Sequence, residues 1–211
     1  MHDQENQQTL SRAERRAAIL DAAASVFFER GFAATSIDAV IERSGGSKRN
    51  IYDEFGNKQG LLIALITETA DKALAVLTVD HSRTPNLHDT LLEFAQRLFT
   101  NYMSPPLLGI FRIIMAESSR FPELAKAFHE KGPGRAVKRL AELLEDASNR
   151  GEIETVNFKV AADQFLGLLR GNLHLEVMLG LRPLPDKAEA EMFVRSAVDM
   201  FVKGLRVENR N

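Results

Sequence analysis

The sequence predicts an all-α protein made of two differently built parts. Apolar residues recur at helical spacing over almost the whole chain of 211 residues, and no stretch alternates in the manner of a half-buried strand. Glycines punctuate the first part, whereas every proline lies at or after Pro85. With 45% hydrophobic and 27% charged residues, the composition is that of an ordinary globular protein with a sizeable core.

The first two helices are defined by their capping signals. Ser11-Arg-Ala-Glu14 forms a capping box, so we expect the first helix to begin at Ser11 and to run to about Arg30, before Gly31. A second capping box, Thr35-Ser-Ile-Asp38, predicts a short helix that Gly45-Gly46 ends.

A third short helix follows the two glycines at once. Ser47 is its expected N-cap, and Ile51 and Phe55 lie four residues apart on one face, which we assign to the core. Asn57 is expected to cap the next helix, which runs to about Leu77.

Longer helical segments follow the loop over residues 79–86, and their lengths are typical of a helical bundle. We therefore divide the chain into a flexible N-terminal arm over 1–10, a three-helix domain over 11–56 and a helical domain over 57–211. The expected segments of the second domain are 87–103, 107–119, 122–149, which Gly132-Pro-Gly interrupts, 157–180 and 186–206.

Several classes of protein are disfavoured by what the sequence lacks. There are no cysteines, so disulfides, a cysteine nucleophile and Cys-ligated metal centres are excluded. No apolar run is long enough to span a membrane, and the polar first residues do not resemble a signal peptide. The common catalytic motifs and the Glu-x-x-His pairs of helical di-iron proteins are missing as well. We expect a cytoplasmic protein that is not an enzyme and has no cofactor, metal or membrane partner.

The second and third helices, joined by a tight glycine turn, form a helix-turn-helix pattern. Once Ile51 and Phe55 are assigned to the core, the outward face of the third helix carries Lys48, Arg49, Asn50 and Tyr52. Arg and Asn side chains can pair with base edges in the major groove of DNA, and Lys and Tyr suit phosphates. Because the net charge is only −2, any contact with DNA must be local.

These residues carry a family resemblance. GFAATSIDAVIERSGGSKRNIYDEFGNKQGLLIALI resembles the DNA-binding domain of TetR-family transcriptional regulators over roughly residues 12–66, most strongly in the run 47–55 and the following Asn-Lys. The resemblance implies phosphate contacts from Ser47, Tyr52 and Lys58, base contacts from Lys48, Arg49 and Asn50, and backbone support from Thr35.

Two acidic residues depart from the family pattern. Asp53 and Glu54 stand where the family tends to carry aromatic or His residues near the phosphates, which they would repel. Asp53 follows Arg49 by four residues and could orient its guanidinium, or it could accept a hydrogen bond from a cytosine amino group. Arg12, Arg15 and Arg16 could be surface charges or could approach the phosphates.

Residues 107–172 resemble the ligand-binding half of the AefR-like, efflux-regulating branch of that family. Arg-Phe-Pro-Glu-Leu and Gly-Pro-Gly-Arg are its most distinctive pieces. Aromatic and methionine-rich helices suit an adaptable apolar pocket, although each residue taken alone also fits a place in the core. The candidate ligand-binding residues are Phe94, Leu98, Tyr102, Phe111, Met115, Phe165, Leu169, Asn172 and Met178.

Polar residues within these apolar runs need a partner, a ligand or solvent. For His174 the sequence leaves open a satisfied position in the core or an interface and a contact with a ligand. Gly167 and Gly171, four residues apart, predict close helix packing. We expect the last two helices to form a dimer seam, with contacts from Phe165, Leu168, Phe193, Val194, Ala197 and Phe201.

These observations together predict a homodimeric, ligand-responsive transcriptional repressor. It would bind a palindromic operator in double-stranded DNA and be released by a small hydrophobic or aromatic effector, and the resemblance implies control of an efflux system. The acidic pair Asp53 and Glu54 keeps one alternative open, a helical protein that binds or sequesters small molecules and has a degenerate DNA-binding part.

Overall fold

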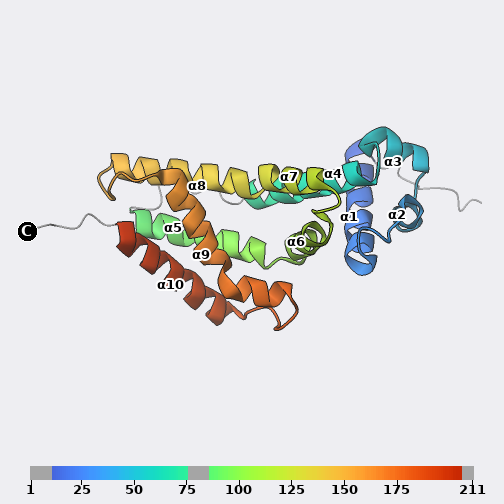
Figure 1. Ribbon diagram of the computed structural model, residues 1–211. Coiled ribbons are helices and arrows are strands. Elements are labelled where there is room, and N and C mark those ends of the chain that lie inside the picture. Colours follow the sequence, from blue (N-terminus) through green and yellow to red (C-terminus); the bar gives the residue numbers. More distant parts are fainter. Residues whose placement is uncertain (1–10, 76–85, 206–211) are drawn as a thin grey trace, which may run out of the picture. The chain divides into compact units, whose positions relative to one another are not determined.

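The computed structural model describes residues 11–75 and 86–205, which contain helices and no strand (Figure 1). The all-α prediction is therefore confirmed. The predicted arm over 1–10, the end of the fourth helix near Leu77 and most of the following loop lie outside the described residues. No helix among the described residues is long and apolar enough to cross a membrane.

The chain divides into two compact units, Met1–Leu65 and Ile66–Asn211. The division falls inside α4 (Lys58–Ala75), whereas the sequence placed the domain boundary after residue 56. Leu61, Leu62 and Leu65 are buried and belong to the first unit. The first turns of α4 therefore complete the core of that unit.

The helices of the first unit begin at side-chain caps. Helix α1 (Arg12–Arg30) has the complete capping box that was predicted, because the Ser11 hydroxyl accepts from the Glu14 amide and the Glu14 carboxylate accepts from the Ser11 amide. Helix α3 (Lys48–Phe55) begins at Ser47, whose hydroxyl accepts from the Asn50 amide. Asn57 accepts from the Gly60 amide at the start of α4, as expected.

The start of α2 (Ile37–Ser44) differs from the prediction. Its N-cap is Ser36, which accepts from the Ala39 amide, and not Thr35. The Thr35 side chain is buried, and its hydroxyl donates to the Gly31 carbonyl at 2.8 Å. Thr35 therefore ties the loop before α2 to the end of α1.

The second unit contains the longer helices of the bundle. Its main packing pairs are α8 with α9 and α5 with α10. Gly132 separates two helices, as its position in the sequence predicted. The bounds are α5 (Leu87–Tyr102), α6 (Pro105–Glu117), α7 (Pro122–Lys131), α8 (Pro133–Asn149), α9 (Phe158–Met178) and α10 (Lys187–Leu205).

Helix α9 bends at Gly171, whose φ of 47° and ψ of −166° are not helical. A Cβ at this position would lie 3.1 Å from the Phe193 ring of α10, whereas a Cβ at Gly167 would meet nothing within 4 Å. Close packing was expected at both glycines, and of these two it is Gly171 that a neighbouring helix of the same chain approaches. A positive φ and a nearby ring both favour glycine at that position.

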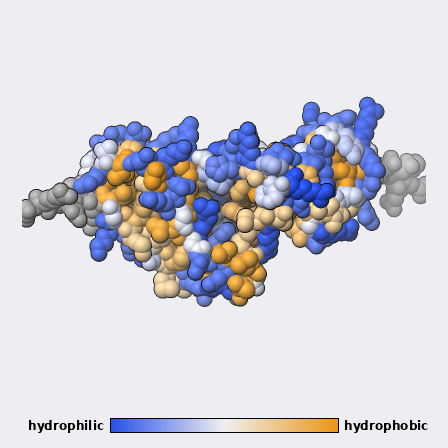
Figure 2. All heavy atoms as spheres, viewed as in Figure 1, coloured by the Kyte–Doolittle hydropathy of each residue, from blue (hydrophilic) through white to orange (hydrophobic). Residues whose placement is uncertain are grey.

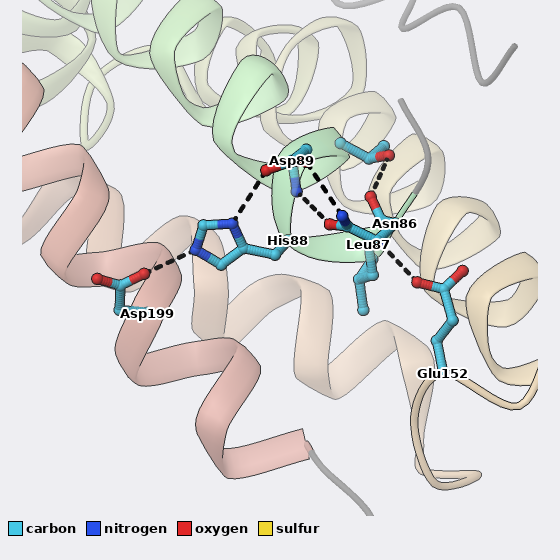
Figure 3. A network of polar contacts seen from close by, with 7 residues as sticks. Asn86, Leu87, His88, Asp89, Glu152 and Asp199 are labelled. Carbon is cyan, nitrogen blue, oxygen red and sulfur yellow. Dashed lines mark hydrogen bonds and ion pairs between the residues drawn. The ribbon is translucent and has the colours of Figure 1, made fainter. Parts of the chain in front are cut away.

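A polar network fastens the start of α5 (Figure 3). His88 Nε2 lies 2.7 Å from a carboxylate oxygen of Asp199 on α10, and Nδ1 lies 3.3 Å from Asp89. Glu152 accepts from the Leu87 amide at 2.5 Å. The hydrogen bond with Asp199, followed by the one with Asp89, raises the pKa of His88 above its ordinary value.

We predict that His88→Gln destabilises the protein more at about pH 5.5 than at about pH 9. A raised pKa in the folded state means that protonation of His88 favours folding below its unfolded pKa, and that this contribution disappears as pH rises through the folded pKa. We expect a loss of about 0.5–1 kcal/mol at the lower pH, which urea unfolding measures. An equal loss of unfolding free energy at both pH values would show that the charge of protonated His88 does not stabilise the fold.

Candidate DNA-binding surface and ligand cavity

Helix α3 has one buried face and one exposed face. Ile51 and Phe55 are buried, which fixes the orientation of the helix in the first unit. Lys48, Arg49 and Asn50 are exposed in its first turn, and 47% of the Tyr52 surface is accessible. The predicted groove-reading side chains therefore share one exposed face, next to the exposed N-cap Ser47.

Two of these cations have acidic neighbours. Arg49 Nε lies 3.5 Å from Asp53 on the same helix, which is the arrangement expected if Asp53 orients the guanidinium. Lys48 Nζ lies 2.9 Å from Asp38 of α2, and this hydrogen bond raises the pKa of Lys48. Both pairs are solvent-exposed, so they are weak and can yield to a phosphate or a base edge.

Glu54 has a role that sequence reasoning missed. Its two carboxylate oxygens accept from Arg12 and Arg16 of α1, each at 2.8 Å. The hydrogen bond from Arg12 holds the pKa of Glu54 below its ordinary value. The Arg16 guanidinium also lies over the Phe55 ring, 4.9 Å from its centroid. The four-residue spacing of Arg12 and Arg16 was the available signal, because it places both on one side of α1.

Arg12, Arg16 and Glu54 border a hollow of about 570 Å³ in the first unit. Arg15, which also lines it, brings a third arginine to this edge, and the turn at Gly45-Gly46 forms its other side. Both turn glycines have positive φ, which brings the start of α3 close to the end of α2. The hollow therefore combines cations of α1 with the N-terminal end of α3.

The ammonium of Lys58, a predicted phosphate contact, is hydrogen-bonded to carbonyl oxygens of the chain itself. It donates to the carbonyl oxygens of Phe32, Ala33 and Thr35, at 2.8, 3.2 and 2.9 Å. It also lies 4.6 Å from the centroid of the Phe32 ring. Lys58 and the buried Thr35 therefore hold the loop between α1 and α2 together, and their side chains are not part of the exposed face of α3.

An apolar cavity of about 40 Å³ lies in the second unit. Leu98, Tyr102 and Phe111 line it, as predicted for a ligand pocket. The other lining residues were not predicted from the sequence. Those on α4 lie on one helical face, and this spacing was the available signal. They are Ile66, Ala70, Ala73 and Leu74 of α4, together with Asn101, Leu107, Ile110, Phe128, Gly132, Pro133 and Ala136.

Six predicted ligand-binding residues do not line this cavity. Met115 and Asn172 are exposed on the surface. Phe94, Phe165 and Leu169 are fully buried in the core, and Met178 packs against that core. Helical spacing gave the same signal for core and cavity residues, because both lie on inward faces.

His174 lies beside the cavity. It is 6% exposed, and its Nε2 has no hydrogen-bond partner among the described residues. Its ring lies 5.8 Å from that of Tyr102 and 5.1 Å from that of Phe111. Burial, followed by the charge of Arg170, lowers the pKa of His174 to about 4. Of the two possibilities that the sequence left open, a satisfied core histidine does not match this arrangement.

Arg112, on α6, donates to the carbonyl oxygens of Val177 and Met178. These are among the last carbonyls of α9, where a cation compensates unpaired acceptors and the negative end of the helix dipole. This contact fastens the C-terminal end of α9 to α6.

We predict that Lys58→Met lowers the free energy of unfolding by about 1–3 kcal/mol, because three carbonyl oxygens lose their donor. Lys48→Met is the matched control, since Lys48 is exposed on α3, and it should leave stability nearly unchanged. Urea unfolding measures both. Equal stability of the two variants would show that the Lys58 contacts contribute nothing to folding.

Comparisons with known proteins agree with this architecture. Residues 19–65 match the bacterial regulatory proteins of the tetR family, and residues 89–204 match the AefR-like transcriptional repressor C-terminal domain. The HTH-type transcriptional regulator YvkB of Bacillus subtilis (strain 168) is 25% identical over 190 residues, covering 90% of this chain and 96% of YvkB.

Two solved structures are similar over nearly the whole chain. A TetR-family regulator from Mesorhizobium loti MAFF303099 has a TM-score of 0.82 and 28% identity, covering 94% of this chain and all of its own. The flavonoid-responsive regulator FrrA has a TM-score of 0.77 and 33% identity, covering 93% of this chain and 99% of its own. These proteins are regulators and not enzymes. With the helix-turn-helix in the first unit and the AefR-like domain in the second, the chain belongs to the TetR family of transcriptional regulators.

Proposed function

We propose that the chain is a homodimeric transcriptional repressor that a hydrophobic, aromatic small molecule releases from a palindromic operator. The main support for this proposal is the exposed face of α3, which Lys48, Arg49 and Asn50 share. The acidic side chains on or beside this face, Asp38, Asp53 and Glu54, each contact a cation. The site of action would be the cytoplasm, where operator DNA is found.

The acidic pair no longer favours the alternative of a degenerate DNA-binding part. Asp53 contacts Arg49, and Glu54 contacts Arg12 and Arg16, so both carboxylates hold cations in position. In the proposed complex Lys48, Arg49 and Asn50 contact base edges, whereas Ser47 and Tyr52 contact phosphates. Arg12, Arg15 and Arg16 would attract the phosphate backbone of the DNA beside them.

The repressor role and the effector rest on the second unit. Its match to the AefR-like transcriptional repressor C-terminal domain supports repression. Control of an efflux system is what the family resemblance of the sequence implies. The apolar lining of the cavity supports a hydrophobic effector, and the name of FrrA, which responds to flavonoids, supports an aromatic one. A ligand releases DNA only if it binds the two conformations unequally, which corresponds to a coupling free energy of about 1–3 kcal/mol.

The proposed dimer uses the outer faces of α9 and α10. Apolar side chains reach the surface over these helices (Figure 2), and they include Leu168, Leu175 and Met200. Met200 and Leu168 border a groove of about 610 Å³ between the two helices. Four residues first assigned to the seam, Phe165, Val194, Ala197 and Phe201, are instead buried in the chain's own core.

We predict that Arg49→Ala lowers the affinity for a selected operator by about tenfold or more, because a forked contact with a base is lost. Selection of bound sequences from random DNA by the full chain would first identify that operator as a palindrome. Tyr52→Ala should weaken binding of all sequences alike. Arg139→Ala, an exposed arginine on α8, is the control and should leave affinity unchanged. Failure of the unmodified protein to select any sequence would contradict the proposed function.

For the dimer, we predict that Met200→Glu raises the dissociation constant at least tenfold, because two buried carboxylates would face each other across the twofold axis. The matched control is Met115→Glu on α6, since the exposed fractions of the two side chains are 62% and 75%. Sedimentation equilibrium measures both variants. A Met200→Glu protein that dimerises like the unmodified chain would place the interface elsewhere.

A further inference from the structure

The second unit contains a buried polar group that its own fold leaves unused. Only 6% of the His174 surface is exposed, and its Nε2 has no hydrogen-bond partner among the described residues. Burying a polar nitrogen without a hydrogen bond destabilises a folded protein. Such a group therefore calls for a function that the packing of the chain does not explain.

The surroundings of His174 connect it to the cavity. Tyr102 and Phe111 both line the cavity, and both rings contact the imidazole, with centroid distances of 5.8 and 5.1 Å. Phe111 also packs edge-on against Phe128, another lining residue, at 4.8 Å. Only a single layer of side chains thus separates the imidazole from the cavity.

The volume of the cavity determines what binding must do. A volume of about 40 Å³ holds water-sized molecules, whereas a cavity that takes one benzene ring is about 150 Å³. An aromatic ligand must therefore displace lining side chains. Phe111 is half-buried, so it can turn outward at a smaller loss of packing than the buried Tyr102. Displacement of Phe111 would open the cavity toward His174.

The chemistry of the imidazole limits the ligand. Because burial lowers the pKa of His174 to about 4, the ring is neutral near pH 7, so Nε2 offers a ligand one hydrogen bond and no charge. The lining of the cavity is apolar except for Asn101 and the Tyr102 hydroxyl, so an ionised carboxylate or ammonium would lose its hydration there. The charge of Arg170, which acts on both His174 and Tyr102, would in addition repel an ammonium. A neutral hydroxyl group on an otherwise apolar molecule fits both conditions.

We propose that His174 is the polar anchor of the effector site and that the effector is an uncharged hydroxylated aromatic molecule, whose hydroxyl group bonds to His174 Nε2 while its ring replaces Phe111. This inference rests on the proposed function, since it assigns the effector's chemical class. The proposal also predicts which helices move on binding. His174 and the two carbonyls that accept from Arg112 of α6 lie in the same C-terminal part of α9. A ligand between α6 and α9 would separate these two helices.

The test uses two pairs of probes that differ only in a hydroxyl or methyl group of similar size. They are 2-naphthol with 2-methylnaphthalene, and p-cresol with p-xylene. The dissociation constant of each is measured by calorimetry with the full chain, with His174→Phe and with His174→Leu. His174→Phe keeps a planar ring between Tyr102 and Phe111, and His174→Leu guards against overpacking. His129→Gln, at an exposed histidine of α7, is the matched control.

We expect both His174 variants to bind the hydroxylated probes about tenfold more weakly than the unmodified chain and to bind the methyl probes unchanged or more tightly. Both variants should fold, because an apolar side chain replaces an unpaired polar one, and thermal unfolding checks this. If the His174 variants lose the same affinity for hydroxyl and methyl probes, or lose affinity for neither, the role of His174 is overturned. The proposal that the cavity is the effector site would then still stand. Failure of all four probes to bind the unmodified chain would contradict the proposed effector function together with this inference.

Discussion

A helix of eight residues is too short to be stable in water alone, so the direction of α3 is determined by what its inward face contacts. Ile51 and Phe55 bury that face, and Glu54 adds a charged connection to Arg12 and Arg16 on α1. The side chains proposed to contact DNA have fixed positions only because these three residues hold the helix. The glycine turn and the Lys58 contacts then fix the elements on either side of it.

The second unit combines a tightly packed core with a small unfilled region that residues of α4, α5, α6, α7 and α8 border. The core residues Phe94, Phe165 and Leu169 are fully buried and hold α5 and α9 together. The cavity lies beside this core and is bordered by Phe111, which contacts Phe128 and His174 edge-on. A ligand would therefore rearrange the side chains around the cavity and leave the core intact, which is what a reversible response to an effector requires.

The local features were predictable from sequence, whereas those that depend on contacts between distant segments were not. The capping box of Ser11 and the caps at Ser47 and Asn57 depend on residues within one turn, so their spacing identified them. Lys58 binds carbonyls more than 20 residues earlier in the chain, and no local pattern reveals that. The candidate cavity was predicted in part, because helical spacing marks inward faces without distinguishing those that meet a neighbour from those that border a gap. Nothing in the sequence marks the Nε2 of His174 as unpartnered.

The bend at Gly171 has a consequence for how this chain can diverge. A side chain at position 171 would need both a backbone conformation that L-residues rarely adopt and the space now occupied by the Phe193 ring. Replacing Phe193 by a smaller residue would remove the second restriction but not the first. As long as α9 keeps this bend, position 171 is therefore restricted to glycine, and a change at 193 alone does not release it.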